Sequence, residues 1–560
     1  GEIDVEGKYE KLANLIFPDI TETIEDLEKK YPERNLKEGA EVTRYAPSPT
    51  GFLHTGALFT SLINKKIADQ TGGVFYLRLE DTDTKREVEG SAKDVLDGLE
   101  AYGLTPEEGL RKDGTGIGNY GPYRQSEREK IYKICAKELV RKGLAYPCFC
   151  TSEDLDKLRA MQEKEKIRPG YYGQFARCRN SSVDEMIERV ERGDKYIVRL
   201  RSGGSHLKKT AYTDKIRGKI EQAQNDQDIV IIKSDNLPTY HFAHAVDDHF
   251  MRTTLVIRGE EWIASVPLHL ELFYMLGFKP VKYAHVPTIM KLDGESKRKL
   301  SKRKDPEAAC SYFLEAGYPT EAMIEYLLTI INSDFEPWRK QNKDKDISEF
   351  EVRLNKMNVA GALFDMAKVN DISKNIIGSM NTDKLFNEVK KWAIKYNKEV
   401  EELINKDEEY FKQILGIERD NVVKVRKDFA KYEDILPNIS YMYKNMFEKD
   451  IEQGYNFAEN IDKSDVKEII VKYMDIIDIS VDKDTWFNNL KEFTDSIGFC
   501  SNMKEYKQNK EKYKGSIADV SGVIRVAVTN RQNTPDIYSI MNVLGIEEAK
   551  RRLELAIDRM

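Results

Sequence analysis

The chain has few cysteines and no long apolar run. Its 560 residues include only 6 cysteines, too few for a disulfide framework, so we expect a reducing, cytoplasmic setting. No apolar stretch approaches the roughly 18 to 20 residues that span a bilayer. The acidic N-terminal segment lacks the apolar core of an export signal. These absences argue against a secreted disulfide scaffold and a membrane protein, and we expect a soluble protein with no membrane partner.

The chain also lacks an excess of positive charge. It has 89 Lys and Arg against 96 Asp and Glu, a formal net charge of −7. This balance argues against a protein that coats nucleic acid through a uniformly basic surface, although a local basic track for RNA is compatible with it. Charged residues are 33% and hydrophobic residues 40% of the chain, as in folded proteins. Its length predicts about two to four domains.

Hydrophobic periodicity predicts how the chain begins. Residues 1–39 are expected to form an appended helical segment, in which Thr21 begins a helix. A strand over 42–45, a Pro/Gly loop, a helix over about 57–70 and a strand over 74–79 then form a βαβ unit. The two strands of such a unit are parallel, and ligands bind at their carboxyl ends.

The α/β pattern is then interrupted and resumes. Residues 123–228 are helix-rich with a strand near 196–200, which predicts an inserted α+β domain. Strands resume at 229–233 and 254–258, and the pattern after residue 303 is helical. We therefore predict an α/β Rossmann-type domain split by an insertion and followed by an all-α region, with segments 1–39, 40–122, 123–228, 229–300, 301–385 and 386–560.

The first chemically informative motif follows the first strand. It reads Arg44-Tyr45-Ala46-Pro47-Ser48-Pro49-Thr50-Gly51-Phe52-Leu53-His54-Thr55-Gly56-Ala57. The prolines stiffen the loop, the glycines allow close backbone approach to a ligand, and the N-terminus of the next helix favours anionic oxygens. The alternative is a rigid turn in which His54 only caps the helix. Because the whole string has to be explained, we interpret it as a phosphate site.

The second motif ends a basic run and reads Lys299-Leu300-Ser301-Lys302-Arg303. Such runs are usually solvated faces or RNA-contact surfaces. Together with the first motif, the run favours nucleotidyl transfer from ATP. A lysine that reaches the site would stabilise the charge that builds on the phosphorus and on the leaving diphosphate.

The two motifs resemble the HIGH and KMSKS motifs of class I aminoacyl-tRNA synthetases. His54 and Gly56 match the first motif at its first and third positions, and Lys299, Ser301 and Lys302 match the second at its first, third and fourth positions. A Rossmann-type placement, at the carboxyl end of a parallel strand, agrees with this resemblance.

Within that class the chain is similar to glutamyl-tRNA synthetases of the bacterial type. The similarity lies in Ala-Pro-Ser-Pro-Thr-Gly at 46–51 and Arg-Leu-Glu-Asp-Thr-Asp at 78–83, whereas glutaminyl relatives carry Pro-Glu-Pro-Asn in the loop. It implies activation of L-glutamate by ATP with Mg²⁺ and transfer of glutamate to tRNA(Glu), with tRNA(Gln) left open as a second substrate. It further implies that residues 40–122 and 229–300 form the catalytic domain, that residues 123–228 bind the acceptor end of the tRNA, that residues 301–385 contact its stem and that residues 386–560 bind the anticodon. We expect a monomer.

The resemblance also implies which residues bind the substrates. The residues that match glutamate-binding positions are Arg44, Ser48, Glu80, Tyr240 and Arg258, and His244 stands where several members have asparagine. Two arginines and one carboxylate complement the two carboxylates and the ammonium group of glutamate. Residues expected at ATP are His54, Gly56, Glu261, Lys299, Ser301, Lys302 and Arg303, of which His54 and Lys302 would be catalytic at the phosphates.

Two interpretations of the role of His244 are open. It would donate a hydrogen bond as asparagine does, or form a pH-sensitive wall of the pocket, because histidine titrates near neutrality. His241 and His249 are expected to pack against the pocket residues from outside.

Three cysteines invite a zinc reading, because related enzymes can carry a metal in the inserted domain. They are Cys148, Cys150 and Cys178. Structural zinc takes four ligands, but position 180 is Asn180, and Tyr172 would be an unusual substitute. We therefore expect ordinary thiols and no metal held by the protein itself.

Two other RNA-related functions are alternatives. A shortened paralogue that glutamylates a modified RNA base lacks an anticodon region, whereas this chain has roughly 180 residues beyond the catalytic part. A noncatalytic RNA-binding paralogue does not explain why His54, Glu80 and Lys302 are all intact.

Overall fold

The computed structural model describes residues 2–49, 51–83 and 90–560. Thr50, which belongs to the first motif, lies outside the described residues. The chain divides into two compact units, one of residues 1–312 and 324–365 and the other of residues 313–323 and 366–560. No helix among the described residues is both long enough and apolar enough to cross a membrane.

The predicted βαβ unit is confirmed. Strand β1 (Val42–Tyr45) pairs in parallel with β2 (Val74–Leu77), and α3 (Thr55–Thr71) connects them. Strand β3 (Glu108–Leu110) continues the sheet in parallel, and β4 (Gly116–Ile117) ends it in antiparallel orientation. Helix α3 stops at Gly72, whose φ of 72° is the left-handed conformation that favours glycine at a helix end.

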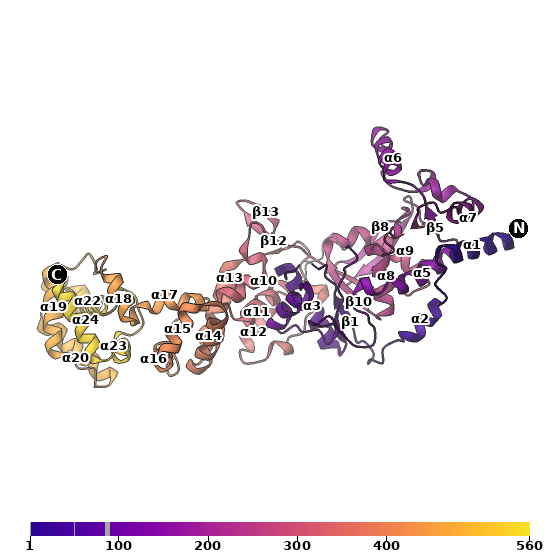
Figure 1. The fold of residues 1–560 in the computed structure, drawn as a ribbon. Coiled ribbons are helices and arrows are strands. Elements are labelled where there is room, and N and C mark those ends of the chain that lie inside the picture. Colours follow the sequence, from indigo (N-terminus) through magenta and orange to yellow (C-terminus); the bar gives the residue numbers. More distant parts are fainter. Residues whose placement is uncertain (1, 50, 84–89) are drawn as a thin grey trace. The chain divides into compact units, whose positions relative to one another are not determined.

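A second sheet lies beside β1. Strands β10 (Leu255–Gly259) and β11 (Lys282–Val286) are parallel, and the backbone N of Thr254 donates to the carbonyl of Val42 at 3.0 Å. The side chain of Asn64 on α3 donates to the carbonyl of Ile257 at 3.2 Å, so α3 packs on both sheets, as Figure 1 shows. The segments that follow β1, β2, β10 and β11 thus come together.

Two strands pair differently from the prediction. Strand β9 (Val230–Ile232) does not resume the catalytic sheet: it pairs with β6 (Ile197–Leu200), which pairs with β5 (Ala145–Cys148), all antiparallel. Instead, the hairpin of β7 (Lys209–Asp214) and β8 (Gly218–Ala223) joins β11. Periodicity identifies a strand but not its partner, so the expectation that residues 229–233 resume the sheet is wrong.

The N-terminal segment forms α1 (Glu2–Ile16) and α2 (Ile24–Lys30). Helix α2 begins after Thr23 rather than at the predicted Thr21: the Thr23 hydroxyl accepts a hydrogen bond from Asp26 N, and the Asp26 carboxylate accepts one from Thr23 N, a capping box. Glu28 contacts His249 at 2.6 Å and Arg252 at 2.5 Å. This segment therefore braces the carboxyl end of α8 (Tyr240–Phe250).

The remaining elements complete the first unit and begin the second. They are α4 (Ser91–Ala101), α5 (Glu129–Arg141), α6 (Ser152–Lys164), α7 (Val183–Glu191), α9 (Val266–Leu276), β12 (Ile289–Asp293), β13 (Ser296–Lys299), α10 (Cys310–Ala316), α11 (Thr320–Ile331), α12 (Phe335–Gln341) and β14 (Ala362–Leu363). Strand β12 pairs with both β13 and β14.

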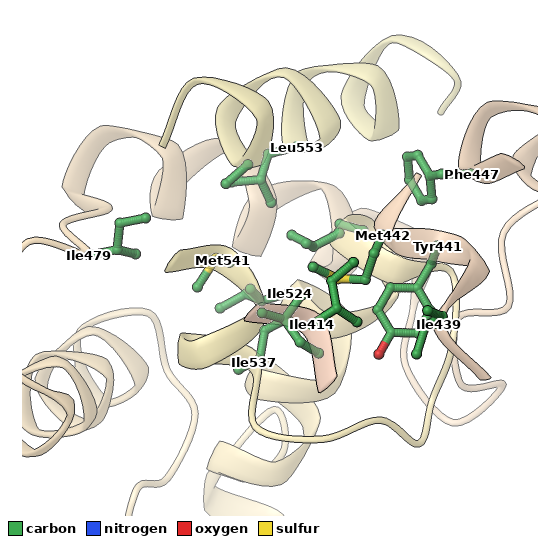
Figure 2. Close-up of a cluster of buried hydrophobic side chains, with 14 of the residues drawn as sticks. Ile414, Ile439, Tyr441, Met442, Phe447, Ile479, Ile524, Ile537, Met541 and Leu553 are labelled. Atoms are coloured by element: carbon green, nitrogen blue, oxygen red, sulfur yellow. The ribbon is translucent and has the colours of Figure 1, made fainter. Parts of the chain in front are cut away.

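The second unit is helical beyond residue 366, as predicted. Its helices are α13 (Met366–Ser379), α14 (Thr382–Tyr396), α15 (Lys398–Lys406), α16 (Glu408–Leu415), α17 (Ile435–Ile439), α18 (Lys444–Ile451), α19 (Lys463–Ile476), α20 (Lys483–Ser496), α21 (Met503–Gln508), α22 (Ile517–Thr529), α23 (Ile537–Leu544) and α24 (Ile546–Asp558). Figure 2 shows buried side chains from several of these helices, such as Ile414, Ile524 and Leu553, meeting in one cluster. This unit therefore has a hydrophobic core of its own.

Candidate active site

A cavity of about 780 Å³ opens where β1, β2, β10 and β11 end. Parallel sheets bind ligands at this edge. The lining includes all but one of the residues expected at glutamate and several of those expected at ATP: Arg44, Ser48, Glu80, Tyr240, Arg258, His54, Gly56, Glu261 and Lys299. The structure therefore gathers most of the predicted site residues around one hollow.

His54 both caps a helix and lines the cavity. Its Nδ1 accepts a hydrogen bond from Gly56 N at 2.8 Å and caps α3, while the residue also lines the cavity. Burial lowers the pKa of His54, and a hydrogen bond to the backbone of Leu300 opposes this shift. Because Nδ1 accepts, the proton of the neutral ring lies on Nε2, on the side of the second motif.

The second motif forms a turn after β13. Lys299 lines the cavity, but Ser301, Lys302 and Arg303 do not. The carboxylate of Asp305 accepts from Ser301 N at 2.9 Å and closes the turn. Lys302 Nζ lies 3.9 Å from the centroid of the Phe52 ring, next to the first motif. The two motifs are thus neighbours, with Lys302 held outside the cavity by a cation–π contact.

Arg44 is held by a carboxylate that sequence analysis did not single out. Asp248, fully buried, accepts from Nε and Nη2 of Arg44, both at 3.1 Å, and from Nη1 of Arg78 at 3.1 Å. Burial opposes ionisation of Asp248, but Arg44 and Arg78 outweigh it and hold the pKa of Asp248 well below its ordinary value. Asp248 therefore orients the arginine at the end of β1.

Glu80 is held in a similar way. Its carboxylate accepts from Arg78 at 3.1 Å and from Gln125 at 3.2 Å, and Gln125 also donates to Asp247 at 2.9 Å. Burial raises the pKa of Glu80, and Arg78 opposes this shift. Glu80 thus presents a fixed carboxylate at the cavity, where a cationic group would pair with it.

His244 departs from its expected place. It does not line the cavity and is fully buried. Its Nδ1 contacts Asp248 at 2.5 Å, and its Nε2 contacts the hydroxyl of Tyr283 at 2.7 Å. Burial lowers the pKa of His244 to about 3, so it forms no wall that titrates near neutrality. Sequence position placed it in the pocket, whereas the helix turns it behind Tyr240.

The two glutamates after β10 lie in different surroundings. Glu260 contacts Arg217 at 2.6 Å and accepts from Thr288 N at 3.3 Å. Glu261 is exposed and lines the cavity. Tyr240 packs on Trp262 with ring centroids 4.2 Å apart, so an aromatic pair forms part of the wall.

Several residues that organise the site were missed. Asp247 and Asp248 stand together in a buried helix, a signal that sequence analysis could have used, because buried carboxylates need partners. Two histidines that contact Arg258, His269 and His285, were not recognised either. They lie 11 and 27 positions from Arg258, on a different helix and strand, and no local sequence pattern marks such contacts.

The three cysteines do lie together. The sulfurs of Cys148, Cys150 and Cys178 are all within 4.8 Å of one another. The hydroxyl of Tyr171 lies 3.4 Å from Sγ of both Cys148 and Cys150. The neighbouring thiols hold the pKa of Cys178 below its ordinary value through hydrogen bonds.

This donor set fits a zinc ion, with three sulfurs and a phenol oxygen in place of the fourth ligand that the sequence seemed to lack. The substitute considered from sequence, Tyr172, instead donates to the carbonyl of Arg168 at 2.7 Å.

Comparisons with known proteins agree with this geometry. A family model described as class I tRNA synthetases (E and Q), catalytic domain, matches residues 41–369, and one described as anticodon binding domain matches residues 384–557. A glutamate–tRNA ligase of Clostridium perfringens (strain 13 / Type A) is 49% identical over 97% of this chain and 100% of the relative. One of Acetivibrio thermocellus is 42% identical over 98% of this chain and 99% of the relative.

A solved structure gives the same answer for the fold. The glutamate tRNA ligase of Elizabethkingia meningosepticum, solved in complex with its amino acid, is 26% identical and has a TM-score of 0.73 over 93% of this chain and 99% of that chain. With the cavity, the two motifs and relatives that match over nearly the full length, the chain belongs to the glutamate–tRNA ligases, a family of class I aminoacyl-tRNA synthetases.

Proposed function

We propose that this chain activates L-glutamate with ATP and transfers it to tRNA(Glu). A carboxylate oxygen of glutamate attacks the α-phosphorus of ATP, and the bond to the bridging oxygen breaks. Diphosphate leaves, and the glutamyl adenylate then passes glutamate to a ribose hydroxyl at the 3′ end of the RNA with release of AMP. The observation that carries the proposal is the cavity, which joins two arginines and a carboxylate to both nucleotide motifs.

On the amino-acid side, charge complementarity assigns the roles. Arg44 and Arg258 would face carboxylates of glutamate, and Glu80 would take the ammonium group. Ser48 and Tyr240 complete this part of the wall. His244 contributes indirectly, through its contacts with Asp248 and Tyr283.

On the ATP side, the N-terminus of α3 would attract phosphate oxygens, and the Nε2 proton of His54 would leave the backbone of Leu300 to reach them. Gly56 keeps this end open: a Cβ there would lie 3.2 Å from Nδ1 of His54. Glu261 would face the ribose. Lys302 would leave Phe52 and, with Lys299, Ser301 and Arg303, stabilise the charge on the diphosphate. Mg²⁺ would enter with ATP as part of the substrate.

On the RNA side, residues 123–228 would bind the acceptor end as an inserted domain, and residues 386–560 would read the anticodon. We propose Arg525 and Arg531, two basic residues of this region, as contacts for the RNA. Arg525 donates to the carbonyls of Thr534 and Pro535, and Arg531 donates to the carbonyl of Pro437 and to the hydroxyl of Ser440 and lies over the Tyr441 ring at 5.1 Å, so the protein holds both side chains in place. We also propose a monomeric enzyme, and the small number of cysteines favours a cytoplasmic location.

The test is aminoacylation with radiolabelled glutamate, ATP and Mg²⁺, with purified tRNA(Glu) and tRNA(Gln) in separate reactions. We expect charging of tRNA(Glu), and a fall in kcat of at least about 100-fold in Lys302→Ala, the size typical of losing one electrostatic stabiliser. Charging of tRNA(Gln) as well would make the enzyme nondiscriminating. Absence of charging of either RNA by the folded protein would contradict the proposal.

A further inference from the structure

We propose that His241, His269 and His285 hold Arg258 as a cation that pairs with no carboxylate among the described residues, and that this free charge selects the side chain of glutamate. The inference rests on the proposed function and deepens it. It assigns to three histidines outside the cavity a positioning role in choosing the amino acid.

Arg258 is gripped by two imidazoles. Its Nε donates to Nε2 of His285 at 3.1 Å, and its Nη2 lies 3.1 Å from Nδ1 of His269. A guanidinium can only donate hydrogen bonds, so each of these ring nitrogens must be an unprotonated acceptor. The two contacts therefore fix the tautomer of both histidines.

The other ring nitrogens complete the network. Nε2 of His269 carries the proton and donates to Nδ1 of His241 at 2.8 Å. Nδ1 of His285 donates to the carboxylate of Asp214 at 2.6 Å. The acceptors that touch Arg258 are thus uncharged, and Asp214, the nearest carboxylate in this chain of contacts, is separated from the guanidinium by a whole imidazole ring.

The remaining terminal nitrogen of the Arg258 guanidinium, Nη1, differs from the other two nitrogens. This atom is buried and has no hydrogen-bond partner among the residues that the structure describes. The side chain is only 5% exposed and lines the cavity. Its other close neighbours are aromatic: the guanidinium carbon lies 4.6 Å from the Tyr283 ring centroid and 5.9 Å from that of Trp262. A buried, unpaired donor of this kind calls for a ligand.

Neighbouring buried arginines pair with carboxylates. Arg44 contacts Asp248 at 3.1 Å, Arg78 contacts Asp248 at 3.1 Å, and Arg128 contacts Asp247 at 2.7 Å. Within the described part of the chain, Arg258 forms no such ion pair. Because a carboxylate partner would cancel its charge, the histidines act as holders that keep the arginine in place and leave the charge available.

The imidazoles are neutral near pH 7. Burial lowers the pKa of His241 to about 4, lowers that of His269 well below its ordinary value, and lowers that of His285. The titratable groups that face His269 are Tyr240, His241, His244, Asp248 and Arg258. Those that face His285 are Tyr212, Asp214, Arg217, Arg258 and Tyr283.

This arrangement discriminates by charge. The γ-carboxylate of glutamate would neutralise Arg258 and satisfy Nη1, whereas the neutral amide of glutamine would leave the charge unpaired in a buried site. If a carboxylate of the protein itself were placed against Arg258, the same discrimination would be lost. That consequence gives the test.

The experiment compares His269→Asn with His269→Asp. Both side chains place an oxygen where Nδ1 of histidine lies, and they differ in charge alone. We expect the asparagine variant to keep the KM for glutamate within about 3-fold of the wild type. The aspartate variant should raise that KM by at least about 30-fold, the lower end for an ion pair disturbed in a buried site, while the KM for ATP stays nearly constant. In the aspartate variant, the ratio of kcat/KM for glutamate to that for glutamine should also fall.

A purely structural role predicts the opposite order. Aspartate would form an ion pair with Arg258, so a merely structural histidine would be replaced at least as well by aspartate as by asparagine. Equal glutamate KM values in the two folded variants would overturn the inference. If His269→Asp does not fold, His285→Gln against His285→Glu makes the same comparison at the position of Nε2.

The control is His249→Asn. The ring of this histidine stacks on that of Phe278 with centroids 3.6 Å apart, and the histidine contacts Glu28 instead of Arg258. The KM of this variant for glutamate should not change. Thermal unfolding of each variant checks its fold. If wild-type protein fails to charge glutamate at all, the proposed function fails; if it charges glutamate and the two position-269 variants behave alike, only this inference fails.

Discussion

At the scale of single residues, Asp248 is the charge on which the site depends. It is fully buried and pairs with Arg44, Arg78 and His244. Asp248→Asn keeps the shape but removes the carboxylate that pairs with Arg44 and one of those that pair with Arg78, which keeps Glu80. We expect a loss of about 3 to 5 kcal/mol in the free energy of unfolding, measured by urea titration.

A matched control is Asp235→Asn. Asp235 pairs with Lys233 at 3.4 Å, but both side chains are substantially exposed, and such pairs contribute at most about 1 kcal/mol. Equal effects of the two substitutions would refute the importance given to Asp248.

Buried histidines give the stability a definite pH dependence. Burial lowers the pKa of His241 to about 4 and that of His244 to about 3, against about 6.5 for an unfolded histidine. Below about pH 6.5 the unfolded chain therefore binds more protons than the folded one, so the free energy of unfolding falls as pH falls from about 6.5 toward 4. Each histidine adds a slope of at most about 1.4 kcal/mol per pH unit.

The check is urea unfolding at several pH values in this window. His241→Gln should flatten the slope, because it removes one of the buried histidines that take up a proton on unfolding. His206→Gln, at an exposed position, should leave the slope unchanged. A wild-type stability that is constant or rises between pH 6.5 and 4 would disprove the role given to these histidines.

Residues that touch the cavity could be predicted, but their supports could not. Arg44 and Arg258 lie near the ends of β1 and β10, Glu80 follows β2, and all three match the family motifs, so the resemblance identified them. Asp248 is 204 positions from Arg44, and nothing in a local pattern joins the two. His244 shows the converse failure, because its sequence position suggested the cavity while its helix turns it into the core.

At the scale of elements, the βαβ unit and the helical C-terminal region were predictable because the spacing of apolar residues indicates each of them. The pairing of β9 with β6, and of β7 with β11, was not. Short strands have similar apolar patterns whichever sheet they join. Their partners are decided by packing between segments that are distant in sequence.

The cysteine cluster between β5 and α7 makes an element-scale prediction about metal. Three sulfurs lie within 4.8 Å of one another beside the Tyr171 hydroxyl, and we expect one zinc ion per chain by elemental analysis. Cys178→Ser should lose the metal, whereas Cys500→Ser, outside the cluster, should keep it. Metal-free wild-type protein, purified without chelator, would refute this assignment.

At the scale of the whole molecule, the chain combines two units with separate tasks. The first unit holds the sheets and the cavity, and the second has its own helical core. The two family matches, 41–369 and 384–557, follow this division closely. The sequence predicted the order of these parts because each carries its own motif or periodicity.

The central claim is that the cavity selects glutamate through the charge of Arg258. The most direct measurement is the ratio of kcat/KM for glutamate to that for glutamine in charging tRNA(Glu) by the wild-type protein. An arginine left without its charged partner costs about 2 to 5 kcal/mol, so the account predicts a ratio of about 30 to several thousand. A ratio near one would contradict it.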